Sequence, residues 1–422
     1  MQAVLIAAGD SSRFWPLNKN HKSQISLLAK PLIYWTIKGL WKTGIKDIIV
    51  VCRPNSSMQA MLERENDLGI RISYVVQEKP LGTGNALWQA KDLIRESFFV
   101  MWPDKVDSSG IVAQMIAKQK EVGAEMVLVG SETSNPQDYG IAKFDGERVV
   151  EIVENPEPGK EPSSIKIMGA CFFQPDFFEY YAKLSTHHEA DYVDAINAYL
   201  QEKKSALVVS EEGPTLKYPW DLFGILELLF GSENFQSSIA STAKIEKGVK
   251  MEGPVAIGER VVIKEGTILQ GPCFIGDDCE IGYHNVLRGP LDLEAKVRTG
   301  AFCEIKHSII QRGTHFHSGF VGDSVVGENC RFGAGFVTGN RRFDRDLVHA
   351  TVKGKKVNTR LDALGVFVGD GSSFGIHSGT MPGVLIGSHC QVGPGTYVFE
   401  NVEDSTVFYG KWQSIIQKNR ME

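Results

Sequence analysis

Gly9, Arg13 and Lys22 follow the first apolar run of the chain, Ala3 to Ala7, within the stretch "LIAAGDSSRFWPLNKNHKSQ". A glycine lets a ligand approach the backbone closely, and two cations can offset the charge of a phosphate group. This arrangement is typical of a phosphate-handling loop, although an ordinary strand-to-helix turn also often contains glycine. The rest of the sequence has to distinguish the two interpretations.

A second concentration of charge lies between Gly339 and Asp362, in "GNRRFDRDLVHATVKGKKVNTRLD". Its basic side chains outnumber its three aspartates, and they include Arg341, Arg342, Lys353, Lys355, Lys356 and Arg360. Such a segment is either a solvated loop or a cationic arm over a phosphate-bearing ligand. The sequence leaves both interpretations open.

The elements that must position the Gly9 loop alternate between strand-like and helical patterns up to about residue 225. The strand-like segments are "AVLIA", "DIIVVC", "RISYVV", "FFVMW" and "EMVLVG". Between them, "PLIYWTIKGLWKTG" has Pro31 suited to a first helical turn and Gly44 suited to a C-cap. This alternation predicts an α/β doubly wound, Rossmann-like domain with helices on both faces of a mostly parallel sheet. Ligands of such folds bind at the carboxyl ends of the strands, where the Gly9 loop lies.

From about residue 243, the chain repeats every six residues. The first run is Ile245, Met251, Ile257, Ile263, Leu269, Ile275 and Ile281, and the second is Val368, Phe374, Thr380, Ile386, Val392 and Val398. Neither a helix nor an alternating strand has this period, whereas a hexapeptide β-helix does, with these residues filling its interior. The second half is therefore predicted to be a left-handed parallel β-helix with Gly339 to Asp362 as an insertion.

Composition and charge limit the class of protein further. A chain of 422 residues, 42% hydrophobic and 23% charged, is typical of a soluble globular protein with two or three domains. The net charge of -6 gives no reason to expect a nucleic-acid partner, and no apolar run is long enough to span a membrane. Seven cysteines without CxxC pairs favour reduced thiols, and the first ten residues do not resemble a signal peptide. We therefore expect a cytoplasmic protein.

A doubly wound domain with an AAG…R…P loop, joined to a hexapeptide β-helix, resembles the sugar-1-phosphate nucleotidyltransferases. It is most similar to the bifunctional, archaeal-type members that also acetylate glucosamine-1-phosphate. The resemblance implies a nucleotidyltransferase domain over 1–225, a linker helix over 226–242 and an acyltransferase-like β-helix over 243–422. It also implies Mg²⁺, UTP or dTTP, a sugar-1-phosphate and acetyl-CoA as ligands. The implied product is UDP-N-acetylglucosamine and the implied assembly a homotrimer, without nucleic-acid or membrane partners.

The resemblance assigns roles to residues of the first domain. Residues that would surround the nucleotide lie in "AAGDSSRFWPL" and "QEKPLGTGNAL": Ala7, Ala8, Gly9, Gln77, Gly82 and Thr83. Arg13 would neutralise the triphosphate, and Lys22 would hold the attacking or transferred phosphate. Asp104 in "VMWPDKVD" would bind Mg²⁺. Gly140 and Glu154, in "DYGIAKFDGERVVEIVENPEP", would bind the sugar.

The β-helix also carries residues that match the family. His317, in "HFHSGFVGD", falls on the catalytic histidine that deprotonates the glucosamine amine, a task that suits a side chain titrating near neutrality. The alternative is an ordinary surface histidine. Arg288 in "VLRGP" and Lys306 in "CEIKHS" would bind the sugar phosphate, and Asn340 would lie near the acetyl donor.

The sequence departs from the family pattern at several positions: glycines are replaced by Ser11 and Pro103, a lysine by Asn155, asparagines by Ile167 and Arg331, a tyrosine by Phe320, and a carboxylate by Thr215. Thr215, in "TLKYPWDLF", stands at the second metal-ligand position, which weakens Mg²⁺ binding unless water or substrate phosphates compensate. Asp221 is the nearest spare carboxylate. The nucleotide half of the site is thus retained, while the sugar and metal half is altered.

Three functions remain compatible with these residues. The first is a bifunctional enzyme that makes a UDP-sugar. The second is a nucleotidyltransferase of different sugar preference whose β-helix only assembles the oligomer. The third is a non-catalytic sensor of sugar nucleotides. The retained set of Arg13, Lys22, Gln77 and Asp104 favours an enzyme, whereas the altered metal and sugar positions favour the sensor.

Overall fold

The computed structural model describes residues 1–211, 213–233, 235–411 and 413–417. The chain divides into two compact units. The first contains Met1–Ser11, Asn20–Ile25 and Lys30–Leu216, and the second contains Ser12–Lys19, Ser26–Ala29 and Lys217–Glu422. The predicted boundary at residue 225 thus differs from the division after Leu216.

The first unit is built on a twisted sheet with the strand order β11-β7-β10-β6-β1-β4-β5. The strands are β1 (Gln2–Ala7), β4 (Asp47–Cys52), β5 (Arg71–Val76), β6 (Phe98–Met101), β7 (Met126–Glu132), β10 (Ile165–Phe173) and β11 (Ser205–Val209). All neighbours in this order are parallel except that β10 runs antiparallel to β6 and β7. A hairpin of β8 (Gly140–Asp145) and β9 (Arg148–Glu154) extends it through a β8–β10 pair.

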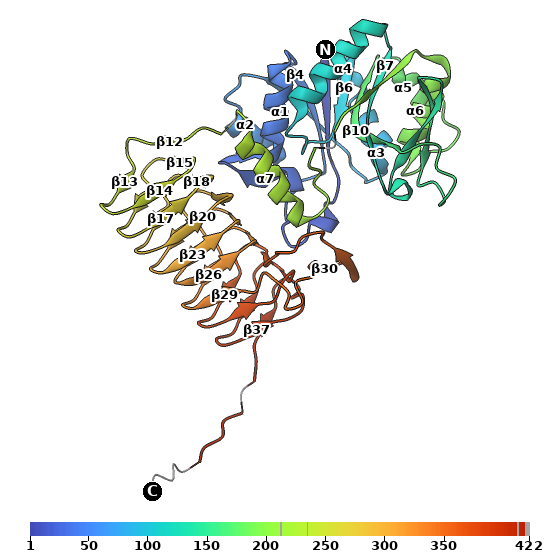
Figure 1. The fold of residues 1–422 in the computed structure, drawn as a ribbon. Coiled ribbons are helices and arrows are strands. Elements are labelled where there is room, and N and C mark those ends of the chain that lie inside the picture. The colour runs from blue at the N-terminus through green and yellow to red at the C-terminus, as the bar shows by residue number, and fades with distance from the viewer. Residues whose placement is uncertain (212, 234, 412, 418–422) are drawn as a thin grey trace. The chain divides into compact units, whose positions relative to one another are not determined.

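Helices cover both faces of this sheet (Figure 1). One face packs against α1 (Leu32–Lys42), α2 (Met58–Glu65) and α4 (Ser108–Val122). The other packs against α3 (Gly82–Trp88), α5 (Phe177–Ala182) and α6 (Asp191–Glu202). Successive residues of β1 alternate between the two cores, so a strand covered on both faces reads as a continuous apolar run. The doubly wound fold predicted from the sequence is confirmed.

Short elements connect these strands and helices. They are η1 (Ser12–Phe14), η2 (Lys22–Gln24), β2 (Ser26–Leu27), β3 (Lys30–Pro31), η3 (Lys91–Leu93) and η4 (Pro136–Asp138). Pro31 is the N-cap of α1 rather than part of its first turn, and Gly44 follows the helix at φ 90°. That left-handed backbone is the conformation that favours glycine after a helix.

The second unit begins with η5 (Pro219–Asp221) and α7 (Leu222–Gly231). A linker helix was expected over 226–242, but the helix starts at Leu222 and Ser238 already belongs to a strand. The helix ends at Gly231 for a local reason. Ser232 has extended backbone, and the buried apolar side chains of α7 all come before it in the sequence.

The rest of the second unit is a parallel β-helix whose rungs run from yellow to red in Figure 1. Its first sheet contains β12 (Ser238–Ile239), β15 (Val255–Ile257), β18 (Cys273–Ile275), β21 (Leu291–Leu293), β24 (Ile309–Ile310), β27 (Val325–Val326), β32 (Phe367–Val368) and β35 (Leu385–Ile386). The second contains β13 (Lys244–Ile245), β16 (Val262–Ile263), β19 (Glu280–Ile281), β22 (Arg298–Thr299), β25 (His315–Phe316), β28 (Arg331–Phe332), β33 (Ser373–Phe374), β36 (Gln391–Val392) and β38 (Val407–Phe408). The third contains β14 (Lys250–Glu252), β17 (Ile268–Gln270), β20 (Val286–Arg288), β23 (Cys303–Lys306), β26 (Gly319–Gly322), β29 (Phe336–Thr338), β34 (Gly379–Thr380) and β37 (Tyr397–Val398).

The six-residue repeat fills the interior of this β-helix. Leu269, Ile275 and Ile281 of the first run are fully buried, as are Val368 and Ile386 of the second. The left-handed β-helix predicted from the repeat is confirmed. The spacing changes between the runs: from Ile305 through Ile310, Phe316 and Val321 to Val326, all buried, three of the four steps contract to five residues.

The insertion between the runs forms a hairpin of β30 (His349–Val352) and β31 (Lys355–Asn358). Val348, Ala350 and Val352 are buried, which gives the hairpin an apolar face. Lys353, Lys355 and Lys356 are exposed, as expected of a solvated tip, and Asn401 Nδ2 donates to Thr351 O over 2.8 Å.

No helix among the described residues combines the length and apolar character that a membrane crossing requires. The cysteine thiols are free and buried.

Candidate functional site

The strand order of the first unit places a topological switch point between β1 and β6. From β1 the chain continues outward to β4 and β5, and then returns to β6 on the other side of β1. Connections on either side of such a pair diverge, which leaves a crevice at the carboxyl ends of the two strands. The Gly9 loop follows β1 and Asp104 follows β6, and Leu5 pairs with Met101 between them. The predicted phosphate loop and metal ligand therefore lie at neighbouring strand ends.

The loop after β1 is shaped for a ligand at its backbone. Ala7 and Ala8 are buried, whereas Gly9 is exposed, and a Cβ built on Gly9 would meet no atom within 4 Å. Ser11 has φ 54°, so this departure from the family glycine occupies a left-handed conformation. Ser11 Oγ accepts a hydrogen bond from the Lys22 N–H over 3.2 Å. The serine thus ties the loop to the segment that carries Lys22.

Lys22 and Asp104, 82 residues apart in the sequence, form an ion pair. Lys22 Nζ lies 3.0 Å from Asp104 Oδ2, and it also donates to the carbonyl of Leu216. The Asp104 carboxylate is nearly buried, and its Oδ1 has no hydrogen-bond partner among the described residues. Without a ligand, each charge is therefore held by the other. The buried Oδ1 of Asp104 remains available to bind a ligand.

His21 supports the Lys22 turn from behind. It is the N-cap of η2, and its Nδ1 accepts from the Ser23 N–H. Burial, and then the charge of Lys22, lower the pKa of His21 to about 4. This histidine is therefore neutral around pH 7.

His21 makes the stability of the first unit depend on pH. Between pH 6.5 and 4, His21 is protonated in the unfolded chain but stays neutral in the folded chain. The free energy of unfolding therefore falls as the pH falls. The shift corresponds to roughly 3 kcal/mol, which we expect wild-type protein to lose from pH 7 to 4 and His21→Asn to retain. Asparagine keeps the N-cap acceptor but does not titrate. Calorimetric unfolding over this range tests the expectation, and equal pH slopes in the two proteins would contradict it.

Gln77 is oriented by the turn that follows β5. Its Nε2 donates to Gly82 O and to Asn85 Oδ1, both over 3.0 Å. Both amide N–H groups are thus used within the protein, and the amide presents Oε1 as an acceptor. Gly82 has φ 91°, and a Cβ there would overlap the backbone at Glu189. Gln77 and Gly82 are therefore placed together, as the sequence predicts.

Gly140 and Glu154 also come together. They are direct partners in the β8–β9 hairpin, and a Cβ on Gly140 would lie 2.6 Å from Glu154 Oε1. Both line a cavity of about 320 Å³ that Thr83 also borders. Burial raises the pKa of Glu154. Asn155, next in the chain, has φ 45°, a conformation that asparagine tolerates better than lysine does.

Trp102, Gly169 and Tyr192 are among the residues of this cavity that sequence reasoning missed. The Trp102 indole lies against Gly169, so closely that a Cβ on Gly169 would overlap it. Tyr192 lies on α6, far along the chain from the recognisable motifs. Trp102 could have been found from the sequence, because it is an aromatic residue directly after a predicted strand. Nothing in the local sequence marks Tyr192.

The described residues contain no group of three metal-ligating side chains. The unpartnered Oδ1 of Asp104 fits a hard cation such as Mg²⁺, which often takes one or two carboxylates and completes its shell with water and phosphates. Thr215 is exposed, and its neighbour Leu216 accepts from Lys22. Asp221 does not supply the missing carboxylate, because its Oδ2 accepts from the N–H groups of Lys217 and Tyr218 and caps η5.

Arg13 and Pro103 are two further positions that the sequence singled out. Arg13 lies on η1 with an exposed guanidinium, within the segment Ser12–Lys19 that groups with the second unit. The Pro103 carbonyl accepts from Thr36 Oγ1 over 3.0 Å, which fixes the backbone just before Asp104.

In the β-helix, Lys306 and Asn340 converge on one carboxylate. Asp323 Oδ2 lies 3.4 Å from Lys306 Nζ and accepts from Asn340 Nδ2 over 2.6 Å. Burial raises the pKa of Asp323, but hydrogen bonds with His307 and then Asn340, together with the charge of Lys306, hold it below its usual value. Phe320 and Asn340 both lie close to Gly322, where a Cβ would crowd them. The structure thus brings together Lys306, Phe320 and Asn340.

Arg288 occupies the register position next to Lys306 on the adjacent coil and pairs with Glu304. His317 lies between β25 and β26, and its side chain is exposed. Burial, followed by the charges of Arg331 and Arg298, lowers the pKa of His315. Arg331 donates to Gly313 O, so this departure from the family asparagine helps to close a turn. The structure does not bring the His317 side chain into contact with Lys306 or Asn340 within the described chain.

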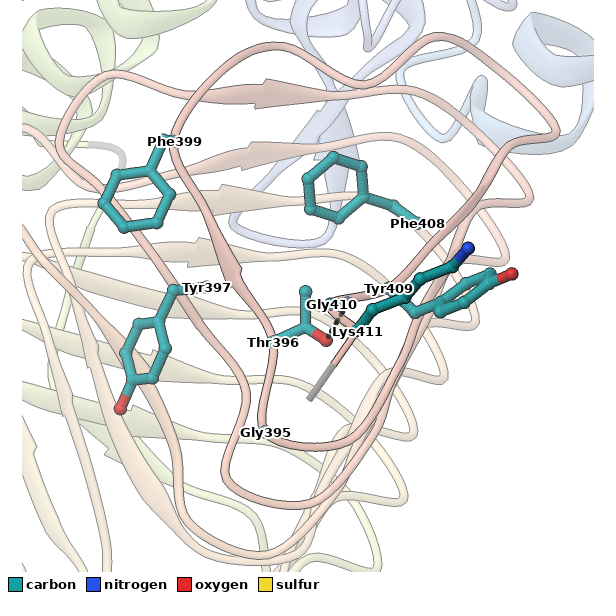
Figure 2. Close-up of a pocket in the computed structure, with 8 residues that line it drawn as sticks. All are labelled: Gly395, Thr396, Tyr397, Phe399, Phe408, Tyr409, Gly410 and Lys411. Atoms are coloured by element: carbon teal, nitrogen blue, oxygen red, sulfur yellow. Dashed lines mark hydrogen bonds between the residues drawn. The ribbon is translucent and has the colours of Figure 1, made fainter. Parts of the chain in front are cut away.

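Another hollow, of about 370 Å³, lies at the last coil of the β-helix (Figure 2). Tyr397, Phe399, Phe408 and Tyr409 line it, and Thr396 Oγ1 accepts from the Gly410 N–H. Its side chains include no carboxylate or imidazole, so it offers no general base near pH 7.

Comparisons with known proteins identify the family of the chain. Residues 2–221 match the nucleotidyl transferase family. The chain is 32% identical over 410 residues to the bifunctional sugar-1-phosphate nucleotidylyltransferase/acetyltransferase of Sulfurisphaera tokodaii, covering 95% of this chain and 98% of that protein. It is 33% identical over 430 residues to the bifunctional protein GlmU of Methanococcus maripaludis, covering 100% of both. The chain therefore belongs to the family of bifunctional sugar-1-phosphate nucleotidylyltransferase/acetyltransferase enzymes.

Proposed function

We propose that this enzyme makes UDP-N-acetylglucosamine: the β-helix acetylates glucosamine-1-phosphate, and the first unit joins the product to UTP. The observation that carries the nucleotidyl step is the Lys22–Asp104 ion pair at the switch point between β1 and β6. It supplies one cation for phosphate and one buried carboxylate for a metal at the same place.

In the nucleotidyl step, an oxygen of the sugar phosphate attacks the α-phosphorus of the nucleotide, and the bond to the β-phosphate breaks to release pyrophosphate. Lys22 would leave Asp104 and hold a phosphate, while Arg13 offsets the remaining charge. Asp104 would then hold Mg²⁺ through its free oxygen, and the ion would supply positive charge to the triphosphate. Gly9 lets the phosphates approach the backbone N–H groups of the loop.

The orientation of Gln77 supports a choice of base. With both N–H groups used by Gly82 and Asn85, Gln77 presents an acceptor to the ligand. Uracil and thymine carry an N–H donor between their two carbonyls, whereas cytosine and adenine have an acceptor at the corresponding ring nitrogen. This favours UTP or dTTP over CTP or ATP.

Metal dependence tests the Thr215 departure. Thr215→Asp should add a second carboxylate beside the Lys22–Asp104 pair, so we expect the half-saturating Mg²⁺ concentration for pyrophosphate release to fall severalfold. The matched control is Thr186→Asp, which adds the same charge on an exposed loop between α5 and α6. Unchanged metal dependence in Thr215→Asp would show that position 215 does not face the metal.

In the acetyl step, His317 would remove a proton from the glucosamine amine. The amine nitrogen attacks the acetyl carbonyl, and the carbon–sulfur bond breaks to release CoA. Arg288 and Lys306 would bind the sugar phosphate, and Asn340 would bind the acetyl donor. The exposed side chain of His317 supports a site completed by a second copy of the chain.

We propose a homotrimer. The β-helix exposes Phe302 and Phe399, each about 70%, together with Tyr283 and Tyr397, and large exposed apolar side chains of this kind mark interaction surfaces. We place the enzyme in the cytoplasm, because its described thiols are free, as reducing compartments keep them.

The test is incubation with Mg²⁺, each nucleoside triphosphate and a panel of sugar-1-phosphates, with pyrophosphate release as the readout. Acetyl-CoA consumption in the presence of glucosamine-1-phosphate is measured in parallel. The proposal expects release with UTP and N-acetylglucosamine-1-phosphate, and CoA formation with glucosamine-1-phosphate. Release without CoA formation would support a second candidate, in which the β-helix is only a scaffold; Phe320 and Arg331, at altered positions of the acetyl site, favour it.

A further inference from the structure

Asp323 carries a nearly buried carboxylate at a turn of the β-helix. It directly follows β26, its backbone has φ 51°, and only 3% of its side chain is exposed. Aspartate tolerates this left-handed conformation better than most residues do. A charge removed from water in this way is costly unless other groups compensate it.

The two oxygens of this carboxylate have different partners. Oδ2 accepts from Asn340 Nδ2 over 2.6 Å and lies 3.4 Å from Lys306 Nζ. Oδ1 lies 2.8 Å from His307 Nδ1. An ionised carboxylate only accepts hydrogen bonds, so the Nδ1 of His307 carries a proton and is the donor. One oxygen therefore contacts both side chains that we assign to ligands of the acetyl step, and the other is held by a histidine.

His307 is itself packed against α7. The rings of His307 and Phe223 have their centroids 4.7 Å apart, and His307 Nε2 lies 3.6 Å from Glu227 Oε1. Phe223 is buried, so this side of the imidazole faces a packed surface. The contacts thus continue from α7 through His307 to Asp323.

Stability alone explains this arrangement poorly. Apolar side chains of similar volume often give the same stability as a buried ion pair, because they avoid the cost of removing charge from water. At another turn of the β-helix, Asp278 has φ 60° and pairs with Arg260, but there the two side chains are 36% and 58% exposed. The burial of Asp323 beside two ligand-binding side chains therefore indicates a role in their function.

We propose that Asp323 is a positioning residue of the acetyl step, in which it orients Asn340 for the acetyl donor and Lys306 for the sugar phosphate. His307 fixes the carboxylate. This inference rests on the proposed roles of these side chains in acetyl transfer. Because Asn340 turns its Nδ2 toward Asp323, its Oδ1 and its second N–H stay available to a ligand. Lys306 is held in one place before the phosphate binds, so less side-chain entropy is lost on binding.

Asp323→Asn and Asp323→Ala separate the two contacts. Asparagine keeps an oxygen that can accept from Asn340, but it has no charge to hold Lys306. With CoA formation as the readout, Asp323→Asn should raise the KM for glucosamine-1-phosphate about tenfold and leave the KM for acetyl-CoA nearly unchanged. Asp323→Ala loses both contacts, so it should raise both KM values and lower kcat/KM by about tenfold to a hundredfold.

Two controls show whether these variants are folded. Pyrophosphate release from UTP and N-acetylglucosamine-1-phosphate should persist in both, because Asp323 belongs to the second unit and Lys22 and Asp104 to the first. Asp278→Asn is the matched control, since it removes the charge of an ion-paired aspartate with the same left-handed backbone. It should keep both KM values of the acetyl step.

His307→Asn and His307→Ala test the anchor. The amide N–H of asparagine can replace the Nδ1–H, and asparagine tolerates the φ of 44° at this position. His307→Asn should therefore acetylate at close to the wild-type rate, whereas His307→Ala should lose about tenfold in kcat/KM. Equal acetylation rates in the two variants would overturn the role of His307.

The remaining outcomes distinguish this inference from the function beneath it. Wild-type kinetics of acetylation in Asp323→Ala would overturn the inference and leave acetyl transfer intact. If Asp323→Ala loses acetylation and pyrophosphate release together with its melting temperature, Asp323 only stabilises the fold, which would also overturn the inference. Wild-type protein that forms no CoA would instead contradict the proposed acetyl step itself.

Discussion

Lys22→Ala is expected to reduce pyrophosphate release by about 10²–10³-fold, the usual effect of removing one preorganised group that stabilises transition-state charge. Lys22 lies at the switch point, 3.0 Å from Asp104, and is only partly exposed. Its ammonium can therefore reach a phosphate without leaving the crevice. The measurement is single-turnover pyrophosphate release with saturating UTP and sugar-1-phosphate.

Two controls make this result interpretable. Lys30→Ala removes another ion-paired lysine of the first unit, which contacts Glu65 and Asp67, and it should retain activity. Because Lys22→Ala leaves the nearly buried Asp104 unpaired, its melting temperature should be measured beside its activity. A folded Lys22→Ala protein with normal pyrophosphate release would refute the role of Lys22 in phosphate binding.

Arg13→Ala is expected to show a comparable loss of nucleotidyl transfer. Its side chain is exposed and forms no ion pair with a described residue, so the substitution should leave the melting temperature unchanged. A loss of activity with normal stability would assign Arg13 to the triphosphate. Normal activity would show that the charge of the triphosphate is offset by other groups.

His317→Ala is expected to remove acetyl-CoA-dependent acetylation of glucosamine-1-phosphate by about 10²–10⁴-fold, because a general base typically contributes that much. Pyrophosphate release from preformed N-acetylglucosamine-1-phosphate should persist, since His317 belongs to the second unit. The oligomeric state should also persist, because buried apolar residues such as Phe316 and Phe332, not the exposed imidazole, fill the coils.

His315→Ala provides the comparison for this second prediction. His315 lies two residues earlier, between Arg298 and Arg331 on neighbouring coils, which lower its pKa after burial does. Acetylation that survives His317→Ala but fails in His315→Ala would move the base to His315. If the wild-type protein shows no acetylation with any acetyl donor, the β-helix is only a scaffold.

The sequence by itself determined the architecture of both units. The alternation of strand and helix patterns indicates a doubly wound sheet, and six-residue spacing indicates a β-helix, because each period reflects which side chains a repeating backbone turns inward. Gly9 could be placed at the carboxyl end of a strand because the strands of a parallel sheet end at one edge, whereas Gln77 and Glu154 were assigned by resemblance to the family. Such patterns are local, so a single chain reveals them.

The tertiary structure decided which distant residues meet. Lys22 and Asp104 pair across 82 residues, Trp102 lies against Gly169, and Tyr192 lines the cavity beside Glu154 from α6. The helix expected over 226–242 ends at Gly231, and the hexapeptide spacing contracts to five residues beside His317. The physical reason is that side-chain contacts depend on strand register and on how helices pack across a sheet. Neither the strand register nor the packing of helices across a sheet can be inferred from the spacing of neighbouring residues.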